Sequence, residues 1–188
     1  MKRFLVVIDV QNDFITGSLE NEAAQEKLGN IAARIERAEN EGDTILYTLD
    51  THSDNYLETL EGEKLPVPHC KRGTIGWKMP ENIASLLNNA LAYQKDTFGS
   101  RALADFFAAQ RVICRNRVNK EKEYEIEIIG FCTDICVISN ALLIRAAMPN
   151  AKIKIRESCT AGTSEVKEDA AFAIAESNQI DVIYEDME

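Results

Sequence analysis

Short apolar runs alternate with longer amphipathic stretches along the chain, and this pattern predicts its architecture. Five apolar runs have the composition of strands buried on both faces of a parallel sheet. They span Arg3–Val10, Asp43–Leu49, Glu125–Phe131, Ala151–Ile155 and Asp181–Glu185. Helical spacing of apolar residues is found over Glu22–Asn40, Asn82–Ala92, Leu103–Gln110, Thr133–Met148 and Glu165–Ser177. Because strands and helices alternate, we predict an α/β fold: a three-layer sandwich with a mostly parallel, doubly wound sheet.

One long segment interrupts this pattern. Between Asp50 and Pro80 the periodicity is weak, and the segment holds both histidines of the chain. Loops of this length inside a compact domain usually serve a function. In an open parallel sheet the ligand site lies beyond the carboxyl ends of the strands. The first candidates for chemistry are therefore the residues that follow strands: Asp9, Asp50, Lys95 after the short run LAYQ, and the segment Cys132–Cys136.

Composition narrows the class of protein. With 188 residues, of which 45% are hydrophobic and 28% charged, the chain fits one globular domain spanning residues 1–188. The net charge of -10 argues against a nucleic-acid partner, because phosphate binding needs clustered Lys and Arg. No apolar run approaches the ~20 residues of a membrane span. The opening MKRFLVVIDV has no signal-peptide cleavage site, so we expect a cytoplasmic location.

The cysteines and the strand ends together suggest nucleophilic catalysis. Five cysteines without a secretion signal argue against a disulfide framework. Asp9, Lys95 and Cys136 could meet at one edge of the sheet, where a base would take the thiol proton and a cation would stabilise the thiolate. If a helix begins near Thr133, Cys136 lies in its first turn. Free N–H groups there favour an anion and could receive the oxyanion of an attacked carbonyl.

Each of these residues also has an ordinary structural interpretation. Asp9 could cap the turn after its strand, Lys95 could lie on the surface, and Cys136 could be a small buried hydrophobe. For Cys132 we expect a side chain that packs and a backbone that faces the site. The side chains of Cys132 and Cys136 would have to face each other in a redox switch, whereas catalysis requires Cys136 to face Asp9 and Lys95.

A second set of polar residues in the long segment suggests a metal site. Asp50 and His52 are two residues apart, so in an extended segment their side chains point the same way. His69 or an acidic residue could complete the site, the acidic candidates being Glu58, Glu61 and Glu63. Imidazole and carboxylate together suit zinc, iron or manganese. The alternative is an acidic loop with two surface histidines.

Five ordered motifs resemble those of the isochorismatase-like cysteine hydrolases, and within that family most of all the nicotinamidases. The motifs are DVQNDF at Asp9–Phe14, D-x-H at Asp50–His52, PVPHC at Pro66–Cys70, KDTFGS at Lys95–Ser100 and GFCTDICV at Gly130–Val137. The similarity runs from Phe4 to about Glu185. It implies a flavodoxin-like fold and a catalytic triad formed by Asp9, Lys95 and Cys136.

The resemblance also implies a reaction. A small amide, nicotinamide in the main interpretation, would be hydrolysed to nicotinate and ammonia through a thioester on Cys136, as a step of NAD metabolism. The backbone N–H groups of Cys132 and Cys136 would hold the oxyanion, and a cis peptide would join Phe131 to Cys132. Phe14 and Trp77 are candidate walls for the substrate ring. Isochorismate hydrolysis is disfavoured, because isochorismatases proper lack the nucleophilic cysteine.

The family further implies one divalent metal ion, for which we prefer zinc over iron or manganese. Asp50, His52 and His69 match its ligands, and Glu61 is our choice for the fourth, with Glu58 as the alternative. Two other functions stay open. The same triad could act on a carbamoyl or ureido compound, or the domain could be non-catalytic, with a redox switch or a structural zinc site. The sequence is compatible with a homo-oligomer.

Overall fold

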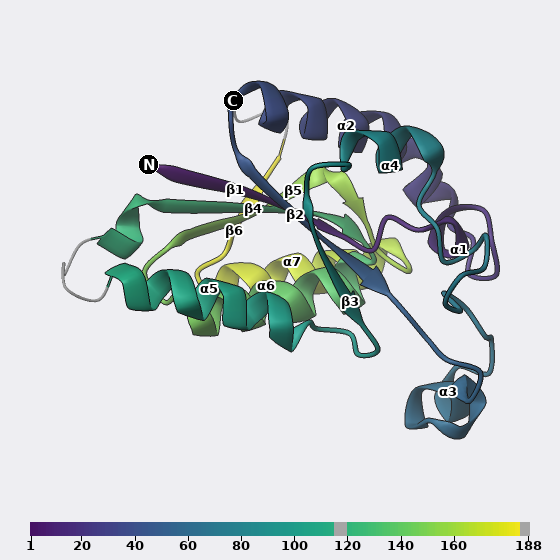
Figure 1. Ribbon diagram of the computed structural model, residues 1–188. Coiled ribbons are helices and arrows are strands. Elements are labelled where there is room, and N and C mark those ends of the chain that lie inside the picture. Colours follow the sequence, from purple (N-terminus) through teal and green to yellow (C-terminus); the bar gives the residue numbers. More distant parts are fainter. Residues whose placement is uncertain (115–119, 185–188) are drawn as a thin grey trace.

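A six-stranded parallel sheet forms the centre of the molecule in the computed structural model, which describes residues 1–114 and 120–184 (Figure 1). The strands lie in the order β3-β2-β1-β4-β5-β6. Their bounds are β1 Lys2–Ile8, β2 Thr44–Asp50, β3 Leu91–Lys95, β4 Tyr124–Phe131, β5 Lys152–Ala161 and β6 Asp181–Ile183. The order reverses between β1 and β4, and such a switch point opens a crevice at the carboxyl ends of the strands.

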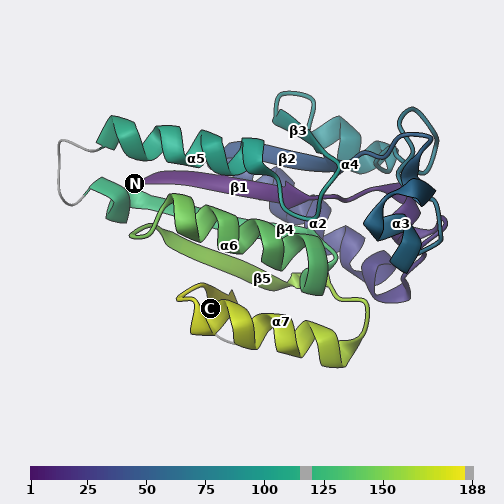
Figure 2. The same ribbon diagram turned by 90° about the horizontal axis from the view of Figure 1, so that it is seen from below.

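Helices cover both faces of this sheet (Figures 1 and 2). One face carries α2 (Glu22–Asn40) and α4 (Glu81–Leu86), and the other carries α5 (Arg101–Cys114), α6 (Ile138–Ala147) and α7 (Glu165–Ser177). The shorter elements are α1 Asn12–Ile15, η1 Tyr56–Glu58, α3 Leu60–Lys64, η2 Lys120–Glu123 and a π-helical turn over Thr133–Val137. The predicted three-layer α/β sandwich is therefore confirmed.

Strand β1 illustrates why these residues form this sheet. Its apolar side chains alternate between two cores: Val6 and Ile8 pack under α5 and α6, whereas Leu5 and Val7 pack under α2. All four are fully buried. A strand that contributes to both cores needs an unbroken apolar run, which is the pattern found in the sequence.

Several predicted boundaries shift in the structure. The helix predicted over Asn82–Ala92 is too long, because α4 ends at Leu86 and β3 begins at Leu91. As the edge strand, β3 is largely exposed and lacks the apolar run of a buried strand. Conversely, β5 continues to Ala161, past the expected end at Ile155. Glu185, the last residue of the fifth predicted strand, lies outside the described residues.

The long segment after β2 forms a closed loop at the carboxyl edge of the sheet. The N–H of His52 donates to the carbonyl of Cys70, and the N–H of Arg72 donates back to the carbonyl of His52, at 3.0 Å each. The residues between these contacts include η1 and α3, which stands clear of the sheet (Figure 1). Within residues 1–114 and 120–184, none of the helices combines the length and apolar character that a bilayer span requires.

Candidate active site

Asp9, Lys95 and Cys136 lie together at the carboxyl edge of the sheet, as their positions after strands predict. Asp9 follows β1, Lys95 ends β3, and Cys136 lies in the π-helical turn after β4. The Lys95 ammonium is 2.6 Å from Oδ2 of Asp9 and 3.6 Å from Sγ of Cys136. All three residues are buried, with exposed fractions of 0%, 6% and 6%. The ammonium thus bridges the carboxylate and the thiol.

Asp9 is held in place by its backbone and by Thr48 on β2. The Thr48 hydroxyl donates to Oδ1 of Asp9 at 2.7 Å and accepts from the Asp9 N–H at 3.2 Å. Asp9 has a backbone φ of +46°, in the left-handed region that residues other than glycine rarely occupy. Such backbone conformations cluster at functional sites. Thr48 was missed by the sequence analysis, and its only signal was a polar residue inside a buried strand.

The charges of the three groups are strongly shifted by burial and by one another. Burial raises the pKa of Asp9, an effect that Lys95 only partly offsets. Burial also raises the pKa of Cys136 well above its ordinary value, so the resting group is a thiol. Burial alone would lower the pKa of Lys95, but Asp9 and Cys136 outweigh it and keep the pKa high. A cation therefore stands beside a proton donor and a carboxylate of increased basicity.

The turn that carries Cys136 has an unusual backbone. The peptide bond between Phe131 and Cys132 is cis, as the resemblance implied. The Cys132 carbonyl then accepts from the N–H groups of Ile135 and Val137, both at 3.1 Å. The turn is π-helical, a form found frequently at functional sites. Burial, aided by the nearby Asp134, raises the pKa of Cys132 to about 12, so its thiol is neutral.

Side chains near α7 hold the first residues of this turn. The Thr133 hydroxyl donates to Glu168 at 2.6 Å. Asp134 accepts from the backbone N–H of Thr163 at 2.7 Å and from its hydroxyl at 2.6 Å. The turn is therefore fixed from outside as well as by its own backbone.

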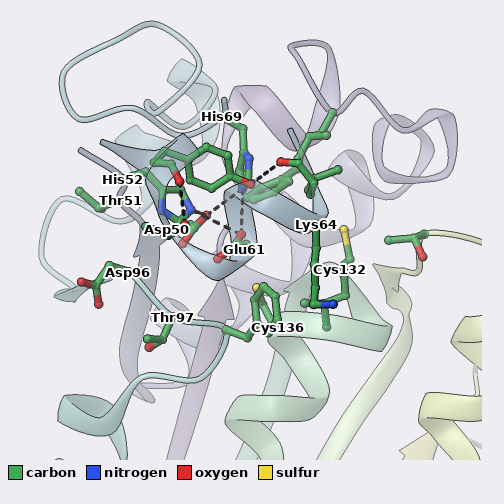
Figure 3. A pocket seen from close by; sticks show the side chains of 18 of the residues that line it. Asp50, Thr51, His52, Glu61, Lys64, His69, Asp96, Thr97, Cys132 and Cys136 are labelled. Carbon is green, nitrogen blue, oxygen red and sulfur yellow. Dashed lines mark hydrogen bonds and ion pairs between the residues drawn. The ribbon is translucent and has the colours of Figure 1, made fainter. Parts of the chain in front are cut away.

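Asp50, His52 and His69 form a buried cluster, and Glu61 lies beside the two histidines (Figure 3). Oδ2 of Asp50 lies 2.9 Å from Nε2 of His52 and 3.4 Å from Nε2 of His69. Oε1 of Glu61 lies 3.7 and 3.6 Å from the same two nitrogens. Glu58 is exposed and does not line the cavity, so the acidic residue at this cluster is Glu61.

The geometry of this cluster fits a divalent metal ion. The ligand atoms of Asp50, His52 and His69 all lie within 4.8 Å of one another, so a single ion could contact all three. Nδ1 of His69 is 2.9 Å from the Val67 carbonyl, a contact that directs Nε2 into the cluster. Nε2 of His52 is buried without a well-aligned hydrogen bond, although Asp50 is adjacent. Two imidazoles and two carboxylates suit zinc, iron or manganese.

Acidic neighbours also change the pKa of a candidate metal ligand, His69. Burial alone would lower the pKa of His69, but the hydrogen bond to Asp50 and the charge of Glu61 outweigh it and raise the pKa. Because a metal binds the neutral imidazole, ion binding at this site would compete with protonation of His69. Gln11, which is fully buried, fixes the backbone of Asp50: its amide donates to the Asp50 carbonyl at 2.9 Å and accepts from the Asp50 N–H at 2.7 Å.

A cavity of about 1360 Å³ opens over the metal-ligand candidates and, of the triad, over Cys136 alone. Its lining includes Cys136, Cys132, the metal-ligand candidates and Phe14. Trp77, the other candidate wall, does not line this cavity. Its indole N–H donates to the Thr51 hydroxyl at 2.9 Å, and the ring packs with the core beneath α2.

Comparison with known families gives a match over nearly the whole chain. The model of the Isochorismatase domain matches residues 3–185. Among curated proteins, none matches the chain significantly. The family on which the sequence motifs converge is thus the one that an independent comparison finds.

Several enzymes of solved structure have the same fold as this chain. A nicotinamidase from Bacillus subtilis is 24% identical, with 98% of this chain and 100% of that chain covered and a TM-score of 0.78. A pyrazinamidase of Pyrococcus horikoshii, in complex with zinc, is 20% identical over 97% and 99%, with a TM-score of 0.73. An N-carbamoylsarcosine amidase from Thermoplasma acidophilum is 22% identical over 97% and 95%, with a TM-score of 0.68. At these identities the likeness shows the fold.

Proposed function

Because this chain belongs to the Isochorismatase domain family, we propose that it is a nicotinamidase-like amidohydrolase. It would hydrolyse a small carboxamide, nicotinamide in the first instance, to the carboxylic acid and ammonia. The observation that carries the proposal is the Lys95 ammonium, which lies 2.6 Å from Asp9 and 3.6 Å from the Cys136 sulfur. This arrangement supports catalysis over a redox switch, because Cys136 faces the cation and its described partners are not thiols.

In the first half of the reaction, Cys136 becomes acylated. Asp9 takes the thiol proton, and the sulfur attacks the carbonyl carbon while Lys95 stabilises the negative charge. Backbone N–H groups of Cys132 and Cys136 receive the oxyanion of the tetrahedral intermediate. Asp9 then returns its proton to the leaving nitrogen, and the C–N bond breaks to release ammonia.

The second half releases the acid. Water attacks the thioester carbonyl while Asp9 accepts one of its protons, and the C–S bond breaks. The sulfur recovers the proton from Asp9, which restores the thiol and the carboxylate. The high basicity that burial gives Asp9 suits a group that alternately takes and returns a proton.

The metal cluster would orient the substrate. Asp50, His52, His69 and Glu61 would hold one divalent ion, with zinc the first choice. When bound, the ion supplies a Lewis acid that can hold a ring nitrogen or a water molecule. The residues that perform the covalent chemistry, Asp9, Lys95 and Cys136, are not among its ligands.

The cavity is large enough for a second class of substrate, which is the alternative to a single-ring amide. Pockets for drug-sized ligands measure about 300–1,000 Å³, and this cavity measures about 1360 Å³. Trp77 does not narrow it. A carbamoyl or ureido compound longer than a single-ring amide would use the same triad and fill more of this space.

Ammonia release decides between these substrates. The purified protein would be assayed with nicotinamide, pyrazinamide and a ureido compound, each with and without a chelator. We expect turnover of the two aromatic amides that falls on chelation. Turnover of the ureido compound alone would select the alternative, and no turnover of any amide by metal-loaded protein would refute the proposed activity. Cys136→Ala is the control for contaminating amidases.

A further inference from the structure

Asn140 is a fully buried polar residue that connects two parts of the active site. It lies on α6, one helical turn after Cys136, with an exposed fraction of 0%. Its amide nitrogen donates to the Cys136 carbonyl at 2.8 Å and to the Phe98 carbonyl at 3.1 Å. Its amide oxygen accepts from the Ser100 N–H at 2.9 Å. Both hydrogens and the oxygen of the amide are thereby used.

The loop that Asn140 holds begins at Lys95. The Lys95 carbonyl accepts from the Thr51 N–H at 2.7 Å, which fixes the end of β3 against β2. Beyond Lys95 the chain leaves the sheet as a loop, whose residues 96–98 line the cavity, and then enters α5. Ser100 caps α5, because its hydroxyl accepts from the Leu103 N–H at 3.2 Å. Asn140 therefore contacts this loop at its far end.

The loop backbone packs directly against α6 at Gly99. A Cβ added to Gly99 would lie 2.6 Å from Cδ1 of Leu143 and 3.4 Å from the Ser139 carbonyl oxygen, both on α6. The absence of a side chain at Gly99 thus lets the loop backbone reach the helix. Its two flanking residues, Phe98 and Ser100, are the ones bound by Asn140.

We propose that Asn140 is a positioning residue that sets the separation between the Lys95 ammonium and the Cys136 sulfur. This inference rests on the proposed roles of Lys95 and Cys136. One amide group holds the backbone of the nucleophile and the loop that follows the cation, so a shift of either part is transmitted to the other. Losing the amide would remove one hydrogen-bond partner each from the Cys136 carbonyl, the Phe98 carbonyl and the Ser100 N–H, and the loop would move away from α6.

Asn140→Leu tests the proposal, since it keeps the branched shape of the side chain and removes all three hydrogen bonds. We expect kcat to fall by about 100-fold, the scale of a displacement of about 1 Å at a catalytic group, with KM little changed. Alkylation of Cys136 by iodoacetamide, followed by mass spectrometry, should slow because Lys95 no longer stabilises the thiolate equally well. Hydrogen exchange at the Ser100 amide should accelerate.

Ile144→Ala is the matched control, because Ile144 is fully buried on the same helix but does not contact the loop through hydrogen bonds. It should lower the free energy of unfolding without changing kcat or the alkylation rate. If Asn140→Leu loses no more kcat than this control, Asn140 is merely structural and the proposal is wrong. Should Asn140→Leu fail to fold, Asn140→Thr replaces it.

A threonine at position 140 can still donate to the Cys136 carbonyl, four residues earlier, but cannot reach the loop. Wild-type kcat in Asn140→Thr would overturn the proposal, and a loss with unchanged KM would support it. Failure of the proposed function is recognised separately: the metal-loaded wild-type protein would then turn over none of the amides. If Cys136→Ala is inactive while Asn140→Leu keeps its kcat, only the positioning role fails.

Discussion

At the scale of single residues, the segment DVQNDF supports both halves of the site. Asp9 contacts the Lys95 ammonium, and Gln11 fixes the backbone of Asp50. Two residues further on, Asp13 accepts from the Cys70 N–H at 2.7 Å, directly after His69. The Phe14 ring packs edge-on against the His69 ring, at 5.7 Å between centroids. Alternate residues of this short segment thus fix the proposed base and the backbone of two candidate metal ligands.

The two cysteines of the nucleophile turn should differ sharply on mutation. Cys136→Ala removes the attacking sulfur, and we expect kcat to fall by more than about 10⁴-fold. Cys132→Ala should keep most of the activity, because the backbone N–H at this position is retained. Both are measured as steady-state ammonia release. Equal losses would instead indicate a paired-thiol site.

Asp9→Asn should be nearly as damaging as loss of the nucleophile. The amide keeps the shape of the carboxylate but cannot take the proton of Cys136, which burial holds as a thiol. Residues that act together in one catalytic step have effects on kcat that do not add. Asp9→Asn combined with Cys136→Ala should therefore lower kcat no further than Cys136→Ala alone. Asp105→Asn, an exposed acid on α5, is the control. Retained turnover in Asp9→Asn would exclude Asp9 as the base.

At the scale of elements, the sequence predicts what depends on neighbouring residues and misses what depends on distant ones. The strand ends place Asp9, Lys95 and Cys136 at one edge, because parallel strands share that edge. The edge strand β3 has no buried apolar run, so only its LAYQ segment was noticed. Thr48 and Asn140 bind partners about forty positions away in the chain, at separations of 39 and 42 residues. No local pattern reveals such contacts.

A buried ion network joins α2, β4 and β5. Glu127 on β4 accepts from Arg34 on α2 at 2.8 Å and from Arg156 on β5 at 2.7 Å. Burial alone would raise the pKa of Glu127, but the two guanidinium groups outweigh it and hold the pKa at about 2. The folded state therefore favours the ionised form of Glu127, which binds a proton less tightly there than in the unfolded chain.

Glu127→Gln should destabilise the protein by about 3 kcal/mol at neutral pH, because two buried guanidinium groups lose their counter-charge. The contribution of a carboxylate with a lowered pKa is complete above the unfolded value of about 4.5 and is lost as the pH falls toward about 2. The difference in free energy of unfolding between wild type and Glu127→Gln should therefore shrink over that window in urea titrations. Glu157→Gln, which removes a partly exposed pair with Lys27, is the control and should change little. A pH-independent difference would contradict the electrostatic origin.

At the scale of the whole molecule, the candidate metal cluster joins the closed loop to the sheet. Asp50 is the last residue of β2, whereas Glu61 and His69 belong to the loop that carries α3. Within this loop, Tyr56 packs against both histidine rings, at 4.7 and 5.1 Å, and donates to the Leu65 carbonyl at 2.9 Å. An ion at the cluster would therefore order this loop and the cavity wall that it forms.

Removal of the metal should loosen this loop selectively. After chelation, we expect faster hydrogen exchange over residues 53–69 and weaker nicotinamide binding, with little change in the strands or in alkylation of Cys136 by a small electrophile, since Cys136 is not one of the proposed ligands. Elemental analysis of protein purified without added metal gives the matching test. His52→Ala and Glu61→Ala should lose the ion, and Glu58→Ala, which alters an exposed residue of the same loop, should keep it. Equal metal content in all of these proteins would refute the site, and loss only in Glu58→Ala would move the fourth ligand to Glu58.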